Sequence, residues 1–368
     1  MKKRHTIICI VGTRPEAVKM APVIRALRAT GWARCIVVAT AQHRDLLDQM
    51  LHRLGVSIDH DLNLMQDGQR SSELLARMLP ALEKILLDEA PSAVLAQGDT
   101  TTVFGTAIAA FHCRIPFGHV EAGLRTRNLD QPFPEEGYRQ MVSRIAQWHF
   151  APTQRAAAAL LAEQIPVERI HVTGNTCIDT LVQTTRELTL PKQTAEKIIL
   201  LTAHRRENFG GPLESIFKAI LQIADRFTDV KIVYPVHPNP NVQTLAQTML
   251  SKHPRIELVE PLDYFAFVEL MHQSTLILTD SGGVQEEAPT LGKPVLVLRD
   301  TTERPEAVEA GVACLVGTDT SRITTIVGRL LEDDAIYGEM AQKVSPYGDG
   351  HASERIVESI RKTIQENK

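Results

Sequence analysis

The chain contains 368 residues, which is enough for two domains of ordinary size and too many for one small module. Its 43% hydrophobic and 23% charged residues are typical of a folded globular protein and exclude wholesale disorder. With 40 basic residues against 44 acidic ones, it lacks the excess of positive charge expected of a protein that grips nucleic acid.

The spacing of cysteine and histidine argues against a disulfide framework and against a metal site. The 5 cysteines lie far apart without a CxxC motif, and no HExxH pattern occurs among the 13 histidines. No apolar run approaches the length of about 18 residues that a membrane span needs, and the run 6–11 is too short for an export signal. We therefore expect a protein of the reducing cytoplasm, with no metal ion and no other cofactor.

Short runs rich in Val, Ile and Leu recur along the chain, each followed by a turn signal and a segment of helical periodicity such as 213–226 or 320–331. This alternation is typical of βαβ units around a parallel sheet, so we expect two doubly wound, Rossmann-like α/β domains. The expected strands are Thr6–Val11, Cys35–Ala39, Ala93–Ala96, Phe117–Val120, Lys197–Leu201, Lys231–Tyr234, Thr275–Leu278 and Pro294–Leu298.

The polar, proline-containing segment 187–197 is the predicted linker between a domain at 1–186 and a domain at 198–368. The last helix is a candidate to pack back on the first domain. Ligands of open α/β sheets bind outside the carboxyl ends of the strands, so two facing sheets would place a cleft between the domains. Motifs at strand ends are therefore the main candidates for function.

The first strand runs into residues 12–16, Gly-Thr-Arg-Pro-Glu, which open a helix. Glycine permits close backbone approach, a helix N-terminus offers N–H groups, and Arg14 and Lys19 add positive charge, so the segment predicts an anion site. A plain βα turn with surface charges is the alternative. The lack of a GxGxxG motif argues against a dinucleotide site.

Acidic residues follow two further strands of the first half. Asp99 precedes a run of threonines, where an aspartate is typically a helix N-cap, but Glu121 puts a second carboxylate at the rim of the same sheet and so indicates a site. A proline-containing loop then carries Glu135 and Glu136 into the expected helix 137–146, where capping is the alternative role for both.

In the second half a strand leads into His204, Arg205 and Arg206, followed closely by glycines. Three side chains that can carry positive charge at a strand end suit an anionic leaving group, and a solvated basic turn paired with Glu207 is the alternative. The next strand ends near His237, which is either a binding residue or a packed loop residue.

The strongest local signal is the segment 278–288, where Ser281, Gly282 and Gly283 separate a strand from a helix. Such a turn presents N–H groups and a hydroxyl to a diphosphate, and Glu287 could take ribose hydroxyls. A tight βα turn without a ligand is the alternative. The segment 299–306, with two arginines, follows the next strand and would close the same cleft.

The segments 12–16, 97–102, 119–126, 204–207 and 280–287 occur in this order in one chain. With this ordered set the chain resembles, over nearly its whole length, the bacterial non-hydrolysing UDP-N-acetylglucosamine 2-epimerases. The resemblance implies a glycosyltransferase-B-like pair of Rossmann domains, a homodimer, and interconversion of UDP-GlcNAc and UDP-ManNAc that supplies ManNAc for surface polysaccharide synthesis.

The resemblance also assigns roles, residue by residue. It implies Asp99, Glu121, Glu135 and His204 as catalytic residues. It implies contacts with the UDP-sugar from Arg14, Lys19, Phe267, Ser281, Gly282, Gly283, Glu287 and Arg304. A regulatory UDP-GlcNAc pocket of some members is matched by Gln42, Arg205 and His237, although Asp45 and Gly68 replace a Gln and an Arg of those members. Leu262 likewise stands where some members have Gln.

The C2 hydrogen of the sugar is not next to a carbonyl, so simple deprotonation faces a very high barrier. Elimination of UDP from C1 with removal of the C2 proton avoids it, and this route needs acid/base groups on both faces and cations around the diphosphate. Rival enzymes are a hydrolysing epimerase, an epimerase of a related UDP-diacetamido sugar and a glycosyltransferase of the same fold. A non-catalytic UDP-sugar sensor is the rival of another class, against which Asp99, Glu121 and Glu135 argue.

Overall fold

The computed structural model describes residues 4–40, 44–66, 68–188 and 196–366, and divides into two compact units. The first unit combines residues 1–180 with 347–368, and the second consists of residues 181–346. The chain therefore leaves the first unit once and returns to it once. The predicted linker 187–197 falls within the second unit and partly outside the described residues, and its role as the domain boundary stays a prediction.

The first unit contains a parallel sheet in the order β3-β2-β1-β4-β5-β6-β7. The chain starts at β1 in the middle, builds outward to β3, and then returns to the other side of β1 with β4. The elements are β1 His5–Val11, α1 Arg14–Arg28, β2 Ala33–Ala39, α2 Arg44–Arg53, β3 His60–Asp61, α3 Ser71–Glu89, β4 Ala93–Gln97, α4 Thr101–His112, β5 Phe117–Val120, α5 Glu135–Ile145, β6 Trp148–Ala151, α6 Gln154–Ala162, η1 Val167–Arg169, β7 Ile170–Val172 and α15 Ala352–Glu366. The helix α7 Thr176–Glu187 begins in this unit and continues into the second.

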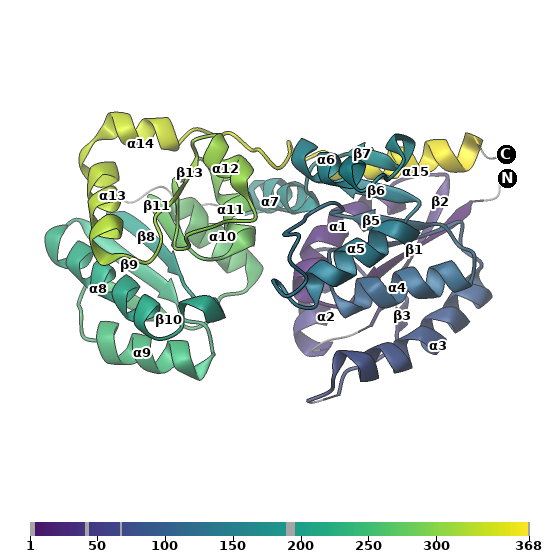
Figure 1. The fold of residues 1–368 in the computed structure, drawn as a ribbon, viewed down its shortest axis with the longest axis horizontal. Helices are drawn as coiled ribbons and strands as arrows, with labels where there is room; N and C mark the ends of the chain where they lie inside the picture. Colours follow the sequence, from purple (N-terminus) through teal and green to yellow (C-terminus); the bar gives the residue numbers. More distant parts are fainter. Residues whose placement is uncertain (1–3, 41–43, 67, 189–195, 367–368) are drawn as a thin grey trace. The chain divides into compact units, whose positions relative to one another are not determined.

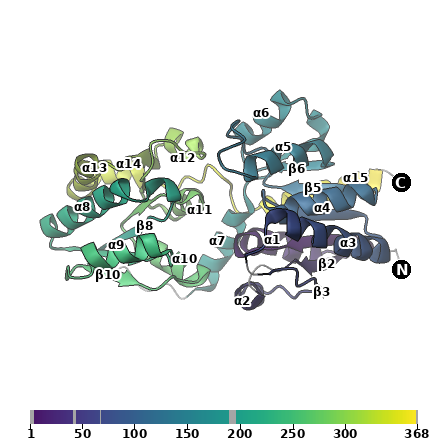
Figure 2. The same ribbon diagram turned by 60° about the horizontal axis from the view of Figure 1, so that its bottom comes forward.

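Helices cover both faces of this sheet, because right-handed crossovers in opposite directions from β1 and β4 put their helices on opposite sides. One group contains α3, α4 and α5, and the other contains α1, α2 and α15 (Figures 1 and 2). On the first face, Phe104 of α4 stacks on Tyr138 of α5 with ring centroids 4.8 Å apart. Strands β1 and β4 are buried almost completely, which explains their continuous apolar runs.

The C-terminal helix α15, yellow in Figure 1, is part of the first unit and packs on α1. Its N-terminus is capped from α7: the buried Asp179 carboxylate accepts hydrogen bonds from the N–H groups of Ala352 and Ser353 and from the Ser353 hydroxyl. At the other end, Trp148 Nε1 donates to Thr363 Oγ1 at 3.0 Å. The returning segment thus completes the first unit.

The second unit contains a six-stranded parallel sheet in the order β10-β9-β8-β11-β12-β13. Its core packs α8, α9 and α13 against β8 and β9. The elements are β8 Lys197–Thr202, η2 Arg206–Asn208, α8 Gly211–Arg226, β9 Val230–Pro235, α9 Pro240–Leu250, β10 Ile256–Val259, α10 Tyr264–Gln273, β11 Leu276–Thr279, α11 Gly282–Glu287, η3 Ala288–Leu291, β12 Val295–Val297, α12 Pro305–Glu309, β13 Ala313–Leu315, α13 Thr320–Glu332 and α14 Asp334–Met340.

The prediction of two doubly wound parallel sheets is confirmed, and each expected strand matches a real one within one or two residues. Five further strands were not predicted: β3, β6, β7, β10 and β13. They have two to four residues each, and β3, β6, β7 and β10 include His, Asp or Glu side chains that weaken the apolar signal. Among the described residues, none of the helices is long and apolar enough to cross a membrane.

Candidate functional site

The predicted motifs lie at the carboxyl ends of the central strands in both units. In the first unit, Arg14 is the first residue of the helix after β1, and the loops after β4 and β5 carry Asp99 and Glu121. In the second unit, the loops after β8 and β11 carry His204 and Ser281. The neighbours β1 and β4, like the neighbours β8 and β11, are the strands at which the order of the sheet reverses. Such switch points are where open α/β sheets bind ligands.

The loop after β1 is organised around Glu16, a residue that the sequence did not single out. Its carboxylate accepts hydrogen bonds from the N–H groups of Gly12 and Thr13, and Thr100 Oγ1 donates to it at 2.7 Å. Burial raises the pKa of this carboxyl to about 7, despite those hydrogen bonds. The N–H groups of Gly12 and Thr13 are thus used internally, so the charged side chain of Arg14 is the stronger candidate to face an anion.

Glu121 is held in place by three side chains from three parts of the first unit. Lys19 Nζ lies 2.5 Å and Asn175 Nδ2 lies 2.8 Å from Glu121 Oε1, while Gln97 Nε2 donates to Oε2. The backbone of Glu121 is left-handed, with φ of 64°. This conformation is uncommon for a residue with a side chain and is found where the surroundings enforce it, often at functional sites.

Asp99 is not the N-cap of α4, because that position belongs to Thr100. Instead, Arg139 of α5 donates to Asp99 Oδ2 through Nε at 2.8 Å and pairs with it through Nη2 at 2.7 Å. The same guanidinium lies 3.3 Å from the fully buried Glu136, which also accepts the N–H groups of Thr126 and Arg127. Arg139 therefore joins the β4 loop to the buried start of α5.

Glu135 is the first residue of α5 and makes no capping hydrogen bond, since the N-cap position is occupied by Pro134. Its Oε2 atom is buried and has no hydrogen-bond partner among the residues that the structure describes. Capping therefore does not explain this residue. An unsatisfied carboxyl oxygen is costly to bury, so it marks a position where a ligand or a proton could complete the site.

His204 is positioned by Asp280, which is fully buried at the end of β11. Asp280 Oδ2 accepts the N–H groups of His204 and Arg205 at 2.9 and 2.8 Å, and Oδ1 lies 3.4 Å from His204 Nδ1. Burial lowers the pKa of His204; the Asp280 charge opposes this shift, while His237 and Arg205 add to it. The buried carboxylate thus fixes the backbone of this turn and lies beside the imidazole, while its Oδ1 has no hydrogen-bond partner among the described residues.

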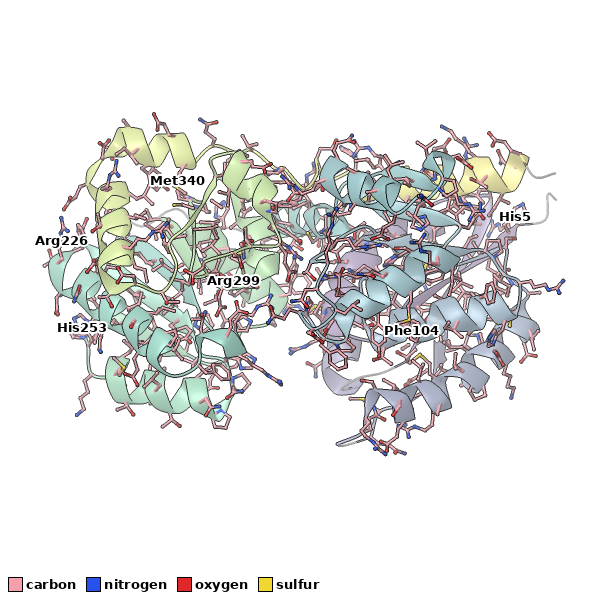
Figure 3. All side chains as sticks on the ribbon, in the orientation of Figure 1. His5, Phe104, Arg226, His253, Arg299 and Met340 are labelled. Atoms are coloured by element: carbon pink, nitrogen blue, oxygen red, sulfur yellow. The ribbon has the colours of Figure 1, made fainter. Side chains whose placement is uncertain are left out.

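The rings of His204 and His237 stack, with centroids 5.3 Å apart and planes inclined by 8°. Glu207 does not neutralise this basic turn, because it pairs with Arg299 at 2.6 Å; Figure 3 labels that arginine. Two of the three regulatory candidates, Arg205 and His237, therefore lie close to His204. The third, Gln42, lies outside the described residues.

The loop after β11 leads into the short helix α11. Gly282 is buried against the Arg304 guanidinium, whose Cζ would be 3.3 Å from an added Cβ, whereas Gly283 is exposed with open space beside it. Arg304 is not a simple solvent-facing cation: it pairs with the buried Glu286 at 2.8 Å and with Glu303 at 2.9 Å.

The remaining candidates lie on nearby elements of the second unit. Glu287 accepts a hydrogen bond from the Tyr264 hydroxyl at 3.1 Å, and Ser281 N donates to Thr279 Oγ1. Phe267 is a half-buried residue of α10, one turn after Tyr264. The side chains of Ser281 and Glu287 thus belong to one sheet edge.

Sequence reasoning missed four residues that hold these candidates: Gln97, Arg139, Asn175 and Asp280. Gln97 and Asp280 are inside motifs that were noticed, and polar residues ending apolar strands could have identified them. Arg139 and Asn175 lie 40 and 54 positions from their carboxylate partners, so no local pattern connects them. No cluster of three metal-ligating side chains occurs among the described residues.

Two doubly wound parallel sheets, acidic strand ends in one and a serine-glycine turn in the other define a protein of the glycosyltransferase-B-like α/β class. A model of the UDP-N-acetylglucosamine 2-epimerase family matches residues 25–361. The curated UDP-N-acetylglucosamine 2-epimerase of Salmonella typhimurium is 49% identical, covering 96% of this chain and 98% of that protein. The chain therefore belongs to the UDP-N-acetylglucosamine 2-epimerase family, whose members are isomerases.

Solved structures agree with this assignment. The UDP-GlcNAc 2-epimerase of Neisseria meningitidis bound to UDP-GlcNAc is 46% identical with a TM-score of 0.91, covering 97% of this chain and 100% of that one. The enzyme of Methanocaldococcus jannaschii in complex with UDP-GlcNAc and UDP is 33% identical with a TM-score of 0.81, covering 97% and 99%. The fold is thus shared even with a more distant relative.

Proposed function

We propose that this protein interconverts UDP-GlcNAc and UDP-ManNAc by eliminating UDP across C1 and C2 and adding it back after protonation of C2 from the other face. The observation that carries the proposal is the set of carboxylates Asp99, Glu121 and Glu135 in the first unit, each at a strand end or helix start. The relatives described above are named UDP-GlcNAc 2-epimerases, and the two solved structures among them contain UDP-GlcNAc.

The carboxylates supply the proton transfers. In the elimination a carboxylate takes the C2 proton, the electron pair of the C2–H bond forms the C1=C2 double bond of a glycal, and the electron pair of the C1–O bond leaves with UDP. Re-addition reverses these changes with a proton delivered to the opposite face of C2. The tethers from Lys19 and Arg139 keep Glu121 and Asp99 in defined directions, which proton transfer requires.

The second unit supplies the groups that hold UDP. His204, fixed by Asp280, stabilises charge on the departing diphosphate, and Ser281, Gly282 and Gly283 contact its oxygens. Glu287 takes ribose hydroxyls. Arg14, Lys19, Phe267 and Arg304 complete the contacts with the nucleotide sugar.

Deuterium incorporation tests the function. Incubated with UDP-GlcNAc in D₂O, the protein should place deuterium at C2 of both product and recovered substrate, because carboxyl protons exchange with solvent. A transferase has no reason to touch C2, a sensor leaves the sugar unchanged, and a hydrolysing enzyme accumulates free ManNAc and UDP. Mass spectrometry with proton NMR separates these outcomes, and an epimer without deuterium at C2 would overturn the elimination route.

His204→Ala tests the role of the histidine. The diphosphate charge grows as the C1–O bond breaks, so turnover should fall more than the affinity for UDP measured by calorimetry. An affinity lost in proportion to the rate would make His204 an ordinary binding residue.

Further proposals concern the oligomeric state, the compartment and the regulation of the enzyme. We propose a homodimer acting in the cytoplasm, consistent with the free thiols of all 5 cysteines, and supplying ManNAc for surface polysaccharide. A second UDP-GlcNAc would bind at Gln42, Arg205 and His237. Light scattering tests the dimer, and the dependence of the initial rate on UDP-GlcNAc in the UDP-ManNAc direction tests the regulation.

A further inference from the structure

The carboxylate of Glu121 shares one of its oxygens between two donors. Both Lys19 Nζ and Asn175 Nδ2 point at Oε1, at 2.5 and 2.8 Å, while Gln97 reaches Oε2. The side chain of Glu121 is only 6% exposed. Oε1 thus receives a charged donor on a flexible stem and a buried amide, while the Gln97 amide holds Oε2. Of the two donors to Oε1, the Asn175 amide is the one with a fixed direction, so with Gln97 it can set the plane of the carboxylate.

The direction of the Asn175 amide is itself determined by its neighbours. Asn175 is 2% exposed, and its Oδ1 accepts the N–H of Cys177 at 3.1 Å in the first turn of α7. Since the oxygen is committed to that N–H, the NH₂ group must face Glu121. The residue therefore presents a donor to the carboxylate in only one orientation.

The backbone of Asn175 is fixed by the segment with which the chain returns to the first unit. Asn175 N donates to Tyr347 O at 2.6 Å. Gly174, with φ of 92°, lies so close to this segment that an added Cβ would be 3.2 Å from Gly348 Cα. Gly348 in turn would bring a Cβ to 3.4 Å from Asn175 N. Residues 174–175 and 347–348 are thus in tight backbone contact.

We infer that Asn175 is a positioning residue for Glu121. The returning segment 347–348 fixes the backbone of Asn175 so that its amide faces Glu121. The inference rests on the proposed function, because it takes Glu121 to be an acid/base group. Without the amide, Oε1 loses its rigid donor and keeps Lys19 on its flexible stem, so the carboxylate departs from the orientation that proton transfer at C2 requires. Turnover then falls while binding of the nucleotide sugar is kept.

A merely structural role for Asn175, as the cap of α7, makes a different prediction. Asn175→Asp keeps the oxygen that accepts the Cys177 N–H and keeps the side-chain volume, but it replaces the donor to Glu121 with a like charge. Asn175→Ser keeps a capping hydroxyl that is too short to reach Glu121. The matched control is Asn239→Asp, because Asn239 caps α9 through Asn241 N at 3.0 Å and touches none of the site carboxylates.

We expect Asn175→Asp and Asn175→Ser to lower kcat at least 10-fold with KM within about threefold, and Asn239→Asp to leave both unchanged. In Asn175→Asp, the acidic limb of the kcat profile should also shift to higher pH, because two adjacent carboxylates cannot both ionise easily. Within the described part of the first unit, Lys19 and the buried His119 are further charged or titratable groups that act on Glu121, and both variants retain them.

The outcomes separate the inference from the function on which it rests. If the wild type exchanges C2 hydrogen with D₂O and both Asn175 variants keep wild-type kcat, the inference is wrong and the function stands. If the wild type neither epimerises nor exchanges, the proposed function fails first. A loss of kcat in the folded Ser variant, verified by circular dichroism and thermal melting, with an unshifted profile in the Asp variant, would assign Asn175 to α7 and overturn its action through Glu121.

Discussion

The two units hold their candidate residues by different means. In the first unit, side chains tether side chains: Lys19 and Asn175 hold Glu121, and Arg139 holds Asp99. In the second unit, the buried Asp280 holds the backbone on both sides of a histidine. The first arrangement fixes charges and the second fixes a loop.

This difference has an energetic consequence. Removing one partner of a buried charge pair leaves the other charge uncompensated, so the first unit should lose both activity and stability when its tethers are cut. A backbone hydrogen bond to a carboxylate can be replaced in part by an amide oxygen, so the second unit should tolerate the matching change better.

The strongest test of the first unit neutralises its carboxylates one at a time. Asp99→Asn, Glu121→Gln and Glu135→Gln should each lower turnover by about 10²-fold or more, because near-isosteres keep the packing but cannot exchange a proton. Thermal melts and steady-state rates check this. The control is Glu332→Gln, which breaks an exposed ion pair with Arg226 and should leave turnover unchanged. Near wild-type turnover in all three variants would invalidate the assignment of the site.

Cutting the Arg139 tether tests whether the charge network carries stability. Arg139→Met should lower the free energy of unfolding by about 3 kcal/mol, because Glu136 is fully buried and loses its cationic partner. The control Arg70→Met removes an ion pair in which the arginine side chain is 81% exposed, and should cost less than about 1 kcal/mol. If a denaturant titration gave equal losses of unfolding free energy for both variants, the buried network would contribute no more stability than an exposed ion pair.

Glu16 makes stability depend on pH. The pKa of this carboxyl is about 7 in the folded protein and 4.5 in the unfolded chain. Its contribution to the free energy of unfolding is therefore fully present below pH 4.5 and is lost as the pH rises through 7, by at most about 3 kcal/mol. The buried His119, with a pKa lowered to about 3, acts in the opposite sense, since its contribution is lost as the pH falls below 6.5. Denaturant titrations between pH 4.5 and 7.5 should show that Glu16→Gln removes the loss of stability with rising pH that Glu16 causes. Parallel curves for wild type and variant would contradict this.

The smallest expected effect is on the second unit. Asp280→Asn should reduce turnover about 10-fold. It should also lower the pKa of His204 further, because in the wild type the Asp280 charge opposes the downward shift that burial causes. Arg205→Gln should move the same pKa upward. NMR titration of the His204 ring measures both, and a shift in the same direction for the two variants would rule out the electrostatic account.

Most of the fold could be predicted because apolar runs such as 93–97 are buried on both faces and leave a continuous signal. The edge strands β7 and β10 have no such continuous signal, since each has only three or four residues and one of them is His171 or Glu257. At the site, the side chains at strand ends were predictable from residue type. Their tethers Arg139 and Asn175 were not, because both depend on contacts that only the folded chain creates.

The return of the chain at residue 347 also affects the order in which the protein can be completed during synthesis. A ribosome finishes the whole of 181–346 before it makes α15, whose N-terminus is capped by Asp179 and which packs on α1. Translation adds about 5–20 residues per second, so the second unit has its full sequence some seconds before the first does. The half of the molecule that emerges first is therefore the last to become complete, and Asn175 receives its backbone partner at residue 347 only at that late stage.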